Sequence, residues 1–453
     1  MFFIPDMLHD KLLSTMPAAE DTVRSVKEQR QFASRKNIHF KDIGETKYTT
    51  SQSKATERIV NGLQPNASLD SGISKTVYNV YNEGQESPSK NPHESMEDLK
   101  FKIRRQYVKE QCYNLDYGYS NEYTSNRYNV YTKFNVLYCP ITKCSSTFWK
   151  GNFQRIGAGP ERRVTSLNRT ELVVLRAHEL SLLIVRDPYK RLFSAYENKL
   201  YHPSLIHWKK VGRPATLFAR NITASDSRNK FYGHDVTFPE LIIYILDRWR
   251  KGLDNDMHFR PMYTLCNPCK HEFRYIAMLE TINDDVEYIM EKLRNNYELT
   301  DTGSDFSKDY FFRIYHGHIQ KVLETKSLLP KIKLPFHRLM LRTWRDLQIR
   351  GFMSKNIPFP FDDELVALNV SKEDFFEAIQ KGVEATTDKE AAHAQKAEAL
   401  HQAYRYVPMN DMESLAEYLS VDCQLFGYDN RPQELFDRSN PISTDFVYLD
   451  GLE

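Results

Sequence analysis

Residues 131–147 read YTKFNVLYCPITKCSST, and this stretch decides the fold class. Its first part, Tyr131–Tyr138, is rich in aromatic and β-branched residues, which favour a β-strand. Cys139-Pro140 ends that strand, because proline lacks the N–H that a strand needs. The hydroxyl residues Ser145–Thr147 can cap a helix that continues to about Ile156. The stretch therefore predicts a strand, a loop and a helix in succession.

A second unit of the same kind begins about forty residues further on. Leu180–Val185 is a continuous apolar run, as expected of a strand that is buried on both faces. Asp187 is a suitable N-cap and Pro188 a suitable first helical residue, and the expected helix continues to about Leu200. Two such units predict an α/β fold with a parallel central sheet flanked by helices.

The remaining sequence sets the expected domain boundaries. Residues 1–97 are polar and show no apolar periodicity, so they predict a disordered stem of low order. We expect a folded domain over 98–430, with a helical insertion at about 300–400, and a C-terminal tail over 431–453. Apolar periodicity predicts helices over 236–251, 284–297, 305–326 and 384–406, the last of them alanine-rich, charged and exposed.

Composition restricts the possible functions. The 453 residues include 62 Lys and Arg against 60 Asp and Glu, so a polyanion must be held by a local basic patch rather than by net charge. No run of 18 apolar residues predicts a transmembrane helix, and Pro5 and Asp6 interrupt what would otherwise be a signal peptide. The sequence by itself therefore predicts a soluble chain.

Sequons and cysteines bear on the compartment. Four N-x-S/T sequons favour the secretory pathway and lie at Asn66, Asn168, Asn221 and Asn369. Cys266 and Cys269 form a C-x-x-C, but no second metal-binding pair accompanies it and Pro268 favours a turn, so neither a zinc site nor a redox pair is expected. The spacing of the six cysteines does not determine how they pair.

The loop Lys143–Thr147 has the residues that an anion site needs. A helix N-terminus supplies N–H donors, Lys143 supplies a cation, and the hydroxyls of Ser146 and Thr147 add donors. The glycines of a Walker P-loop are absent, which disfavours a kinase. An ordinary N-capped helix beside a surface lysine explains the loop equally well.

Arg186 and Ser194 suggest a second part of the same site. Arg186 follows the second strand, where ligands bind in open α/β sheets, and Ser194 lies about two turns along the next helix. An arginine and a serine so placed can hold a phosphate monoester. A local Arg186–Asp187 ion pair and a small packing serine are the alternative.

Together these motifs resemble those of Golgi carbohydrate sulfotransferases, in the subfamily of the chondroitin and dermatan 4-O-sulfotransferases and the glucuronyl 3-O-sulfotransferase. Residues 138–150 resemble the 5′-phosphosulfate-binding motif, and residues 186–196, continued by 198–199, are similar to the 3′-phosphate-binding motif. The resemblance extends to 258–261, 265–269 and 425–428 and covers roughly 98–430. In this sequence Thr142 stands where the family usually has proline, Cys144-Ser145 replaces a valine and a small residue, and Phe259 replaces tryptophan.

The resemblance implies a P-loop-like fold and transfer of sulfate from 3′-phosphoadenosine 5′-phosphosulfate (PAPS), without a metal, to a glycan hydroxyl. It implies that Lys143 and Cys144–Thr147 hold the phosphosulfate, that Lys143 stabilises the leaving phosphate, and that Arg186 and Ser194 hold the 3′-phosphate. The expected acceptor is an anionic glycan or glycosaminoglycan, specifically the 4-hydroxyl of N-acetylgalactosamine in chondroitin or dermatan. The resemblance also implies a Golgi location and a membrane anchor, which this sequence does not show.

A sugar hydroxyl requires a general base, and histidine is neutral near pH 7. We expect His258 to be this base, with His178 as second candidate and Glu280 as third. The basic span Lys199–Lys230, with the rings of Tyr201, His202, Trp208 and Phe218, can hold the anionic glycan by ion pairs and stacking, or be an exposed basic loop. Nucleic acid is not an expected partner. The altered loop around Thr142 leaves an inactive glycan- or nucleotide-binding protein of the same fold as an alternative, and a P-loop kinase as a third.

Overall fold

The computed structural model describes residues 95–115, 127–178, 180–223, 232–297, 315–317, 319–320, 322–326, 329, 334–439, 441 and 445–452. All of them lie in one of the two units into which the chain divides, Leu69–Glu453. Residues 1–94 of the expected stem lie outside the described residues. Ser95 caps helix α4 (Met96–Asn114) in a reciprocal capping box with Asp98, so the last residues assigned to the stem are already helical.

One five-stranded sheet runs in the order β3-β1-β2-β4-β5, and its strands are β1 (Asn129–Tyr131), β2 (Val136–Cys139), β3 (Glu161–Arg163), β4 (Leu180–Val185) and β5 (Tyr275–Met278). Strands β2, β4 and β5 are parallel, which confirms the predicted parallel sheet. Strand β1 is antiparallel to both of its neighbours, β2 and β3. The sequence did not predict this antiparallel part of the sheet. The single strand expected over 131–138 is in fact a hairpin, because Asn135 takes a left-handed conformation (φ 46°) that asparagine tolerates.

The helices fall close to their predicted positions. Asp187 caps helix α7, which begins at Pro188, and helices α10 and α12 occupy the ranges expected near 236–251 and 284–297. After α4 the helices are α5 (Ser146–Arg155), α6 (Arg169–His178), α7 (Pro188–Tyr196), α8 (Leu205–His207), α9 (Arg213–Ala219), α10 (Phe238–Arg250), α11 (Met262–Leu265), α12 (Ile282–Tyr297), α15 (Phe336–Ile349), α16 (Glu364–Asn369), α17 (Lys372–Glu384), α18 (Lys389–Arg405), α19 (Met409–Phe426) and α20 (Gln433–Phe436). Two π-helical turns, η3 (Glu197–Tyr201) and η4 (Trp208–Gly212), and the 3₁₀ turns η1 (Thr132–Phe134), η2 (Val164–Ser166) and η5 (Leu279–Thr281) complete the described elements. None of the helices in the described part of the chain is long and apolar enough to cross a bilayer.

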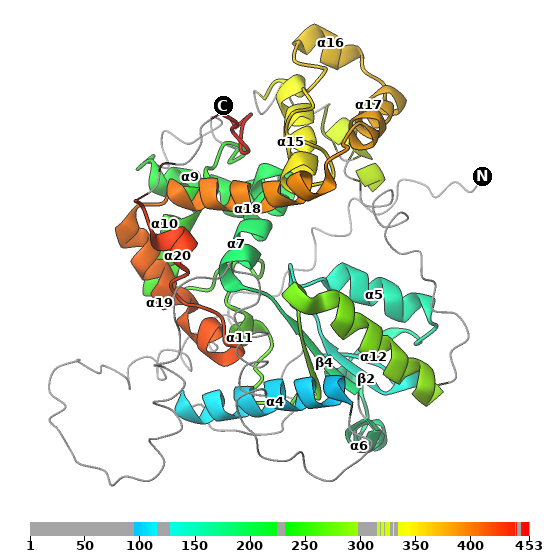
Figure 1. Cartoon of the computed structure of the whole chain (residues 1–453). Helices are drawn as coiled ribbons and strands as arrows, with labels where there is room; N and C mark the ends of the chain where they lie inside the picture. Colours follow the sequence, from blue (N-terminus) through cyan, green and yellow to red (C-terminus); the bar gives the residue numbers. More distant parts are fainter. Residues whose placement is uncertain are drawn as a thin grey trace, which may run out of the picture. The chain divides into compact units, whose positions relative to one another are not determined.

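The core consists of two clusters of buried side chains. One surrounds the sheet and is completed by α4 and α12, which both pack on β5. The other joins α7, α10, α15, α18 and α19, which gather beyond the end of the sheet at which α7 begins (Figure 1). Helices α15–α18, part of the expected insertion, therefore share the core of α7 and α10.

The expectation that 384–406 is an exposed helix is wrong for one of its faces. Ala392, Ala399 and Tyr404 of α18 are buried. Small alanine side chains let neighbouring backbones approach: a Cβ on Gly351 would lie 2.6 Å from the carbonyl oxygen of Ala392. Within the expected C-terminal tail, Tyr448 is buried and the carbonyl of Gly451 accepts a 2.7 Å hydrogen bond from Arg342, so these residues also pack on the helices.

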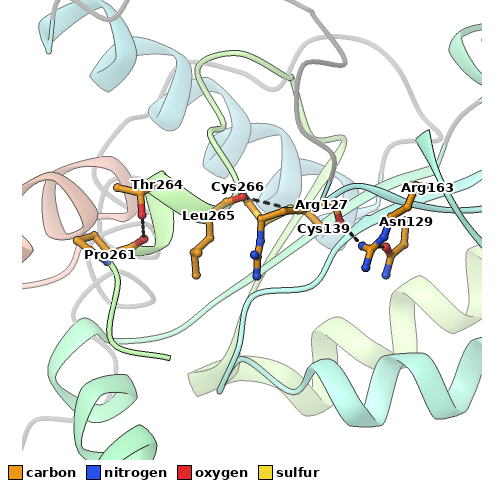
Figure 2. The surroundings of a disulfide bond; sticks show 8 residues. All are labelled: Arg127, Asn129, Cys139, Arg163, Pro261, Thr264, Leu265 and Cys266. Atoms are coloured by element: carbon orange, nitrogen blue, oxygen red, sulfur yellow. Dashed lines mark hydrogen bonds between the residues drawn. A yellow bond between two sulfur atoms is a disulfide. The ribbon is translucent and has the colours of Figure 1, made fainter. Parts of the chain in front are cut away.

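Two disulfides connect the segment that follows α11 to helix α4 and to strand β2. Cys112 of α4 pairs with Cys269, and Cys139 at the end of β2 pairs with Cys266. The two cysteines of the C-x-x-C thus have different partners. Figure 2 shows the second bridge, beside which Thr264 donates a 2.7 Å hydrogen bond to the carbonyl of Pro261. The bridge ties the loop that follows β2 to the segment around α11.

Candidate functional site

The loop between β2 and α5 has an unusual backbone. Lys143 (φ 68°) and Ser145 (φ 55°) are both left-handed, a conformation that side chains disfavour. Ser145 is the N-cap of α5, but its side chain makes no capping hydrogen bond, contrary to the simplest expectation for this serine. The N–H groups in the first turn of a helix have no acceptor within the helix. Here they are not capped by the serine and can donate to an anion.

Arg191, which is buried in α7, connects this loop to the segment that contains Met257 and Arg260. Its Nε donates to the carbonyl of Thr142 at 3.0 Å and its Nη1 to the carbonyl of Arg260 at 2.7 Å. Its Nη2 reaches the hydroxyl of Thr142 at 3.2 Å and the carbonyl of Met257 at 3.3 Å. The Thr142 hydroxyl in turn donates to Met257 at 2.9 Å, a bond that proline at this position could not make. Sequence reasoning missed Arg191, although it lies inside the 186–196 motif.

Lys143 and Arg186 lie together, at the ends of the neighbouring strands β2 and β4. The guanidinium of Arg186 donates to the carbonyl of Lys143 at 3.2 Å. Burial, together with the charges of Arg350 and Arg186, lowers the pKa of Lys143 to about 7 against the opposing effect of Glu197. Cations crowded in this way indicate a place where an anion is stabilised.

Arg186 and Ser194 are both buried, Arg186 directly after β4 and Ser194 within α7. Next to them, Glu280 accepts a hydrogen bond from the N–H of Asp187 at 3.0 Å and one from the hydroxyl of Tyr428 at 2.8 Å. Glu280 therefore joins the ends of β4 and β5 to the residues that follow α19. Both of its oxygens are engaged, which favours a structural role over that of a base.

The other predicted loop residues take different environments. Ser146 is half-buried and Thr147 is exposed, both in the first turn of α5. The thiol of Cys144 points into the core, 3.8 Å from the sulfur of Met262, and burial raises its pKa to about 12. Only the backbone of Cys144 is left to face a ligand.

His258 is held by a carboxylate two residues before it. Its Nδ1 lies 2.6 Å from Oδ1 of Asp256, and its backbone N–H donates to the same oxygen at 2.9 Å. Burial lowers the pKa of His258, Asp256 raises it, and the charges of Lys199 and Lys143 lower it. The hydrogen bond from the Thr142 hydroxyl to the carbonyl of Met257 joins the residue before His258 to the residue before Lys143. Asp256 was missed, although an aspartate two residues before a histidine is a recognisable signal.

His207 completes this group, with its ring 5.1 Å from that of His258. Within the described part of the chain, His207, Asp256 and His258 are the one group whose atoms could ligate a metal, all within 4.8 Å of one another. Burial lowers the pKa of His207 to about 4, and Lys199 lowers it as well. A positively charged neighbour opposes a second cation, so the arrangement fits an imidazole oriented by a carboxylate better than a metal site.

His178, the second candidate base, lies elsewhere. It ends α6 directly before β4, whereas Arg186 follows β4. The six residues of β4 span about 20 Å. His178 is therefore placed at the opposite edge of the sheet from Lys143.

The proposed stacking surface also requires correction. Tyr201, His202 and Trp208 are buried, and the indole of Trp208 donates to the carbonyl of Leu200 at 2.7 Å. Tyr201 and Trp208 lie in the two π-helical turns and belong to the core cluster that includes α7. Phe218 alone of the named rings is exposed. The part of the basic span over 224–231 lies outside the described residues.

Comparisons with known proteins agree with this site. Residues 126–321 match the sequence profile described as the sulfotransferase family. The chain is 30% identical over 178 residues to carbohydrate sulfotransferase 14 of Danio rerio, covering 36% of this chain and 47% of the relative. It is 23% identical over 255 residues to carbohydrate sulfotransferase 8 of Homo sapiens (52% and 57%) and 26% identical over 203 residues to human carbohydrate sulfotransferase 10 (40% and 56%).

The chain thus spans about half the length of these relatives. No solved structure matches it. The matched segment contains both strand–loop–helix units, the Arg191 contacts and the Asp256–His258 pair. Residues 126–321 are thus similar to the sulfotransferase family, and the relatives that the chain resembles are carbohydrate sulfotransferases.

Proposed function

We propose that this protein is a PAPS-dependent carbohydrate O-sulfotransferase that transfers sulfate to the 4-hydroxyl of N-acetylgalactosamine in a chondroitin or dermatan chain. The observation that carries the proposal is the meeting of two anion-binding loops, in which Arg186 donates to the carbonyl of Lys143 at 3.2 Å. One loop suits a phosphosulfate and the other a phosphate monoester, and PAPS contains both groups.

The residues then have distinct roles. The first turn of α5, with Ser146 and Thr147, binds the 5′-phosphosulfate through N–H and hydroxyl donors. Arg186 and Ser194 bind the 3′-phosphate. As the bond from sulfur to the bridging oxygen breaks, negative charge develops on the departing phosphate, and the ammonium of Lys143 stabilises it.

His258 is the general base in this scheme. With the Nδ1–H donated to Asp256, the lone pair of Nε2 is left to accept the proton of the sugar hydroxyl. The sugar oxygen forms its bond to sulfur while the bond to the phosphate breaks, so His258 ends protonated next to an ionised Asp256. The same hydrogen bonds from His258 hold the pKa of Asp256 at about 2 in spite of its burial.

Covalent chemistry supports an oxidising compartment. Two disulfides require an oxidising environment, and the sequons at Asn168, Asn221 and Asn369 are exposed. Asn66 lies outside the described residues. These features support the Golgi lumen, where an anionic glycosaminoglycan acceptor is made, with a membrane anchor as the family implies.

The test is incubation of the full chain with sulfur-labelled PAPS and a panel of desulfated chondroitin, dermatan and other glycans. We expect labelled chondroitin or dermatan, and a loss of about 10²-fold or more in Lys143→Ala. Binding of 3′-phosphoadenosine 5′-phosphate (PAP) without transfer to any glycan would instead indicate an inactive binding protein. Labelling from ATP would indicate a kinase.

A further inference from the structure

The matched segment ends at residue 321, yet helices beyond it reach the donor-binding loops. Arg350, at the end of α15, donates from Nε to Glu197 at 2.5 Å and to Asp346 at 3.1 Å. Glu197 opens the turn η3 that continues α7, only three residues after Ser194. The end of α15 is thus fixed beside the proposed 3′-phosphate site.

Helix α18 packs against both α15 and α7, and Figure 1 shows it crossing α7 and meeting α15. Gln395 donates to the carbonyl of Gln348, in the last turn of α15, at 2.7 Å and to the carbonyl of Met353, just after that helix, at 2.9 Å. Further along, the hydroxyl of Tyr404 donates to the carbonyl of Tyr189 at 3.0 Å, in the first turn of α7.

Lys396 lies between these two anchors. Lys396 lies four residues before Leu400 and eight residues before Tyr404. This spacing places it on the stripe of α18 that faces α7. Eight residues of helix span about 12 Å, so Lys396 lies that far along α18 from the contact with Tyr189. Among the residues that the structure describes, Lys396 has no ion-pair or hydrogen-bond partner.

Charge supports a ligand at this place. Lys396 is exposed to solvent, yet surrounding protein desolvates its ammonium and lowers its pKa to about 8, and Arg186 contributes the largest of the charges that lower it. Asp346, which accepts a hydrogen bond from Arg350 as Glu197 does, has its pKa raised by burial. Four basic side chains, those of Lys143, Arg186, Arg350 and Lys396, thus act on one another around two carboxyl groups, those of Glu197 and Asp346, and this excess of basic groups suits an anion.

We propose that Lys396 of α18 is a donor-binding residue that contacts the 3′-phosphate of PAPS together with Arg186, so that helices outside the matched segment complete the nucleotide site. This inference rests on the proposed function and extends it, since it assigns recognition of the 3′-phosphate to a residue beyond the family motif. An ammonium beside the guanidinium neutralises the second charge of a phosphate monoester, which one arginine leaves uncompensated.

The test compares the binding of PAP and of 5′-AMP to the full chain by calorimetry. Lys396→Gln should weaken PAP binding by about 10- to 100-fold, the usual effect of losing a hydrogen bond to a charged group, and leave 5′-AMP binding unchanged. Lys396→Arg should restore most of the affinity. Lys381→Gln, on an exposed lysine paired with Glu377 in α17, is the matched control and should change neither.

Turnover adds a second readout. In Lys396→Gln the KM for PAPS should rise while kcat at saturating donor stays near that of the wild type, because the residue does not touch the reacting atoms. Unchanged PAP binding, or an equal loss for both nucleotides, would overturn the role of Lys396. Absence of PAP binding by the wild-type chain would overturn the proposed function itself.

Discussion

Oδ1 of Asp256 lies 2.6 Å from Nδ1 of His258 and also accepts the backbone N–H of His258. Two bonds from one residue to one oxygen fix both the loop and the ring. The carboxylate therefore determines which imidazole nitrogen is available for a proton.

The first prediction follows from this pair. His258→Gln should lower kcat by about 10²–10⁴-fold with donor affinity intact. Asp256→Asn should lower kcat less and shift the acid limb of the pH–rate profile downward, because the carboxylate raises the pKa of His258. Since burial holds the pKa of His258 below its usual 6.5, the wild-type rate should fall only below about pH 6.5. Asp254→Asn, on a neighbouring exposed carboxylate, is the control. An acid limb that moves upward in Asp256→Asn would contradict the assignment.

The second prediction concerns the protonation of Lys143. With its pKa near 7 in the free protein, much of this ammonium is deprotonated at pH 8, and an anionic nucleotide favours the charged form. PAP binding at pH 8 should therefore take up a proton, and affinity should fall by as much as about 10-fold per pH unit above 7. Calorimetry in buffers of different ionisation enthalpy measures the uptake. Lys143→Arg, which stays charged, should reduce the uptake to the share of Lys396, whose pKa of about 8 also rises when the anion binds; an uptake that is unchanged in this variant would contradict the role of Lys143.

A third prediction tests the Arg191 contacts. A lysine at this position cannot reach Thr142, Met257 and Arg260 together, so Arg191→Lys should leave buried carbonyls unpaired and cost about 1–3 kcal/mol in the free energy of unfolding. PAP affinity should fall as well, although Arg191 itself is buried away from the ligand. Chemical denaturation and calorimetry measure the two effects. Lys190→Ala, on the exposed neighbour, should leave the free energy of unfolding unchanged. Equal stability of Arg191→Lys and the wild type would contradict a stabilising role for the Arg191 hydrogen bonds.

The fourth prediction concerns the bridge between Cys139 and Cys266. Replacing both by serine should reduce the free energy of unfolding by about 2–5 kcal/mol. It should also weaken PAP binding, because Cys139 lies four residues before Lys143 and holds the start of the loop. Cys423→Ser, which removes a free buried thiol, serves as the control. If the double variant bound PAP like the wild type, the bridge would have no part in positioning the loop.

The sequence predicted what local signals encode. Apolar runs gave β4, the Asp187-Pro188 pair gave the start of α7, and the hydroxyl residues after Pro140 gave the start of α5. Two such units in succession were enough to predict the parallel sheet and to place Lys143 and Arg186 at its end. Each of these features depends on neighbours within a few residues, so a single chain suffices to read them.

Tertiary structure decided the features that depend on distant partners. The hairpin at Asn135 divided one expected strand, and the partners of Cys266 and Cys269 lie 127 and 157 residues away. The buried face of α18 exists because α15 and α7 cover it, a fact that its alanine-rich sequence could not show. By itself the sequence determined the two loops that we propose to bind the donor, because helix ends and strand ends are local. Only the folded chain brought Arg350 and Lys396 beside them. Burial and charge at that place depend on helices that lie far from these loops in the sequence.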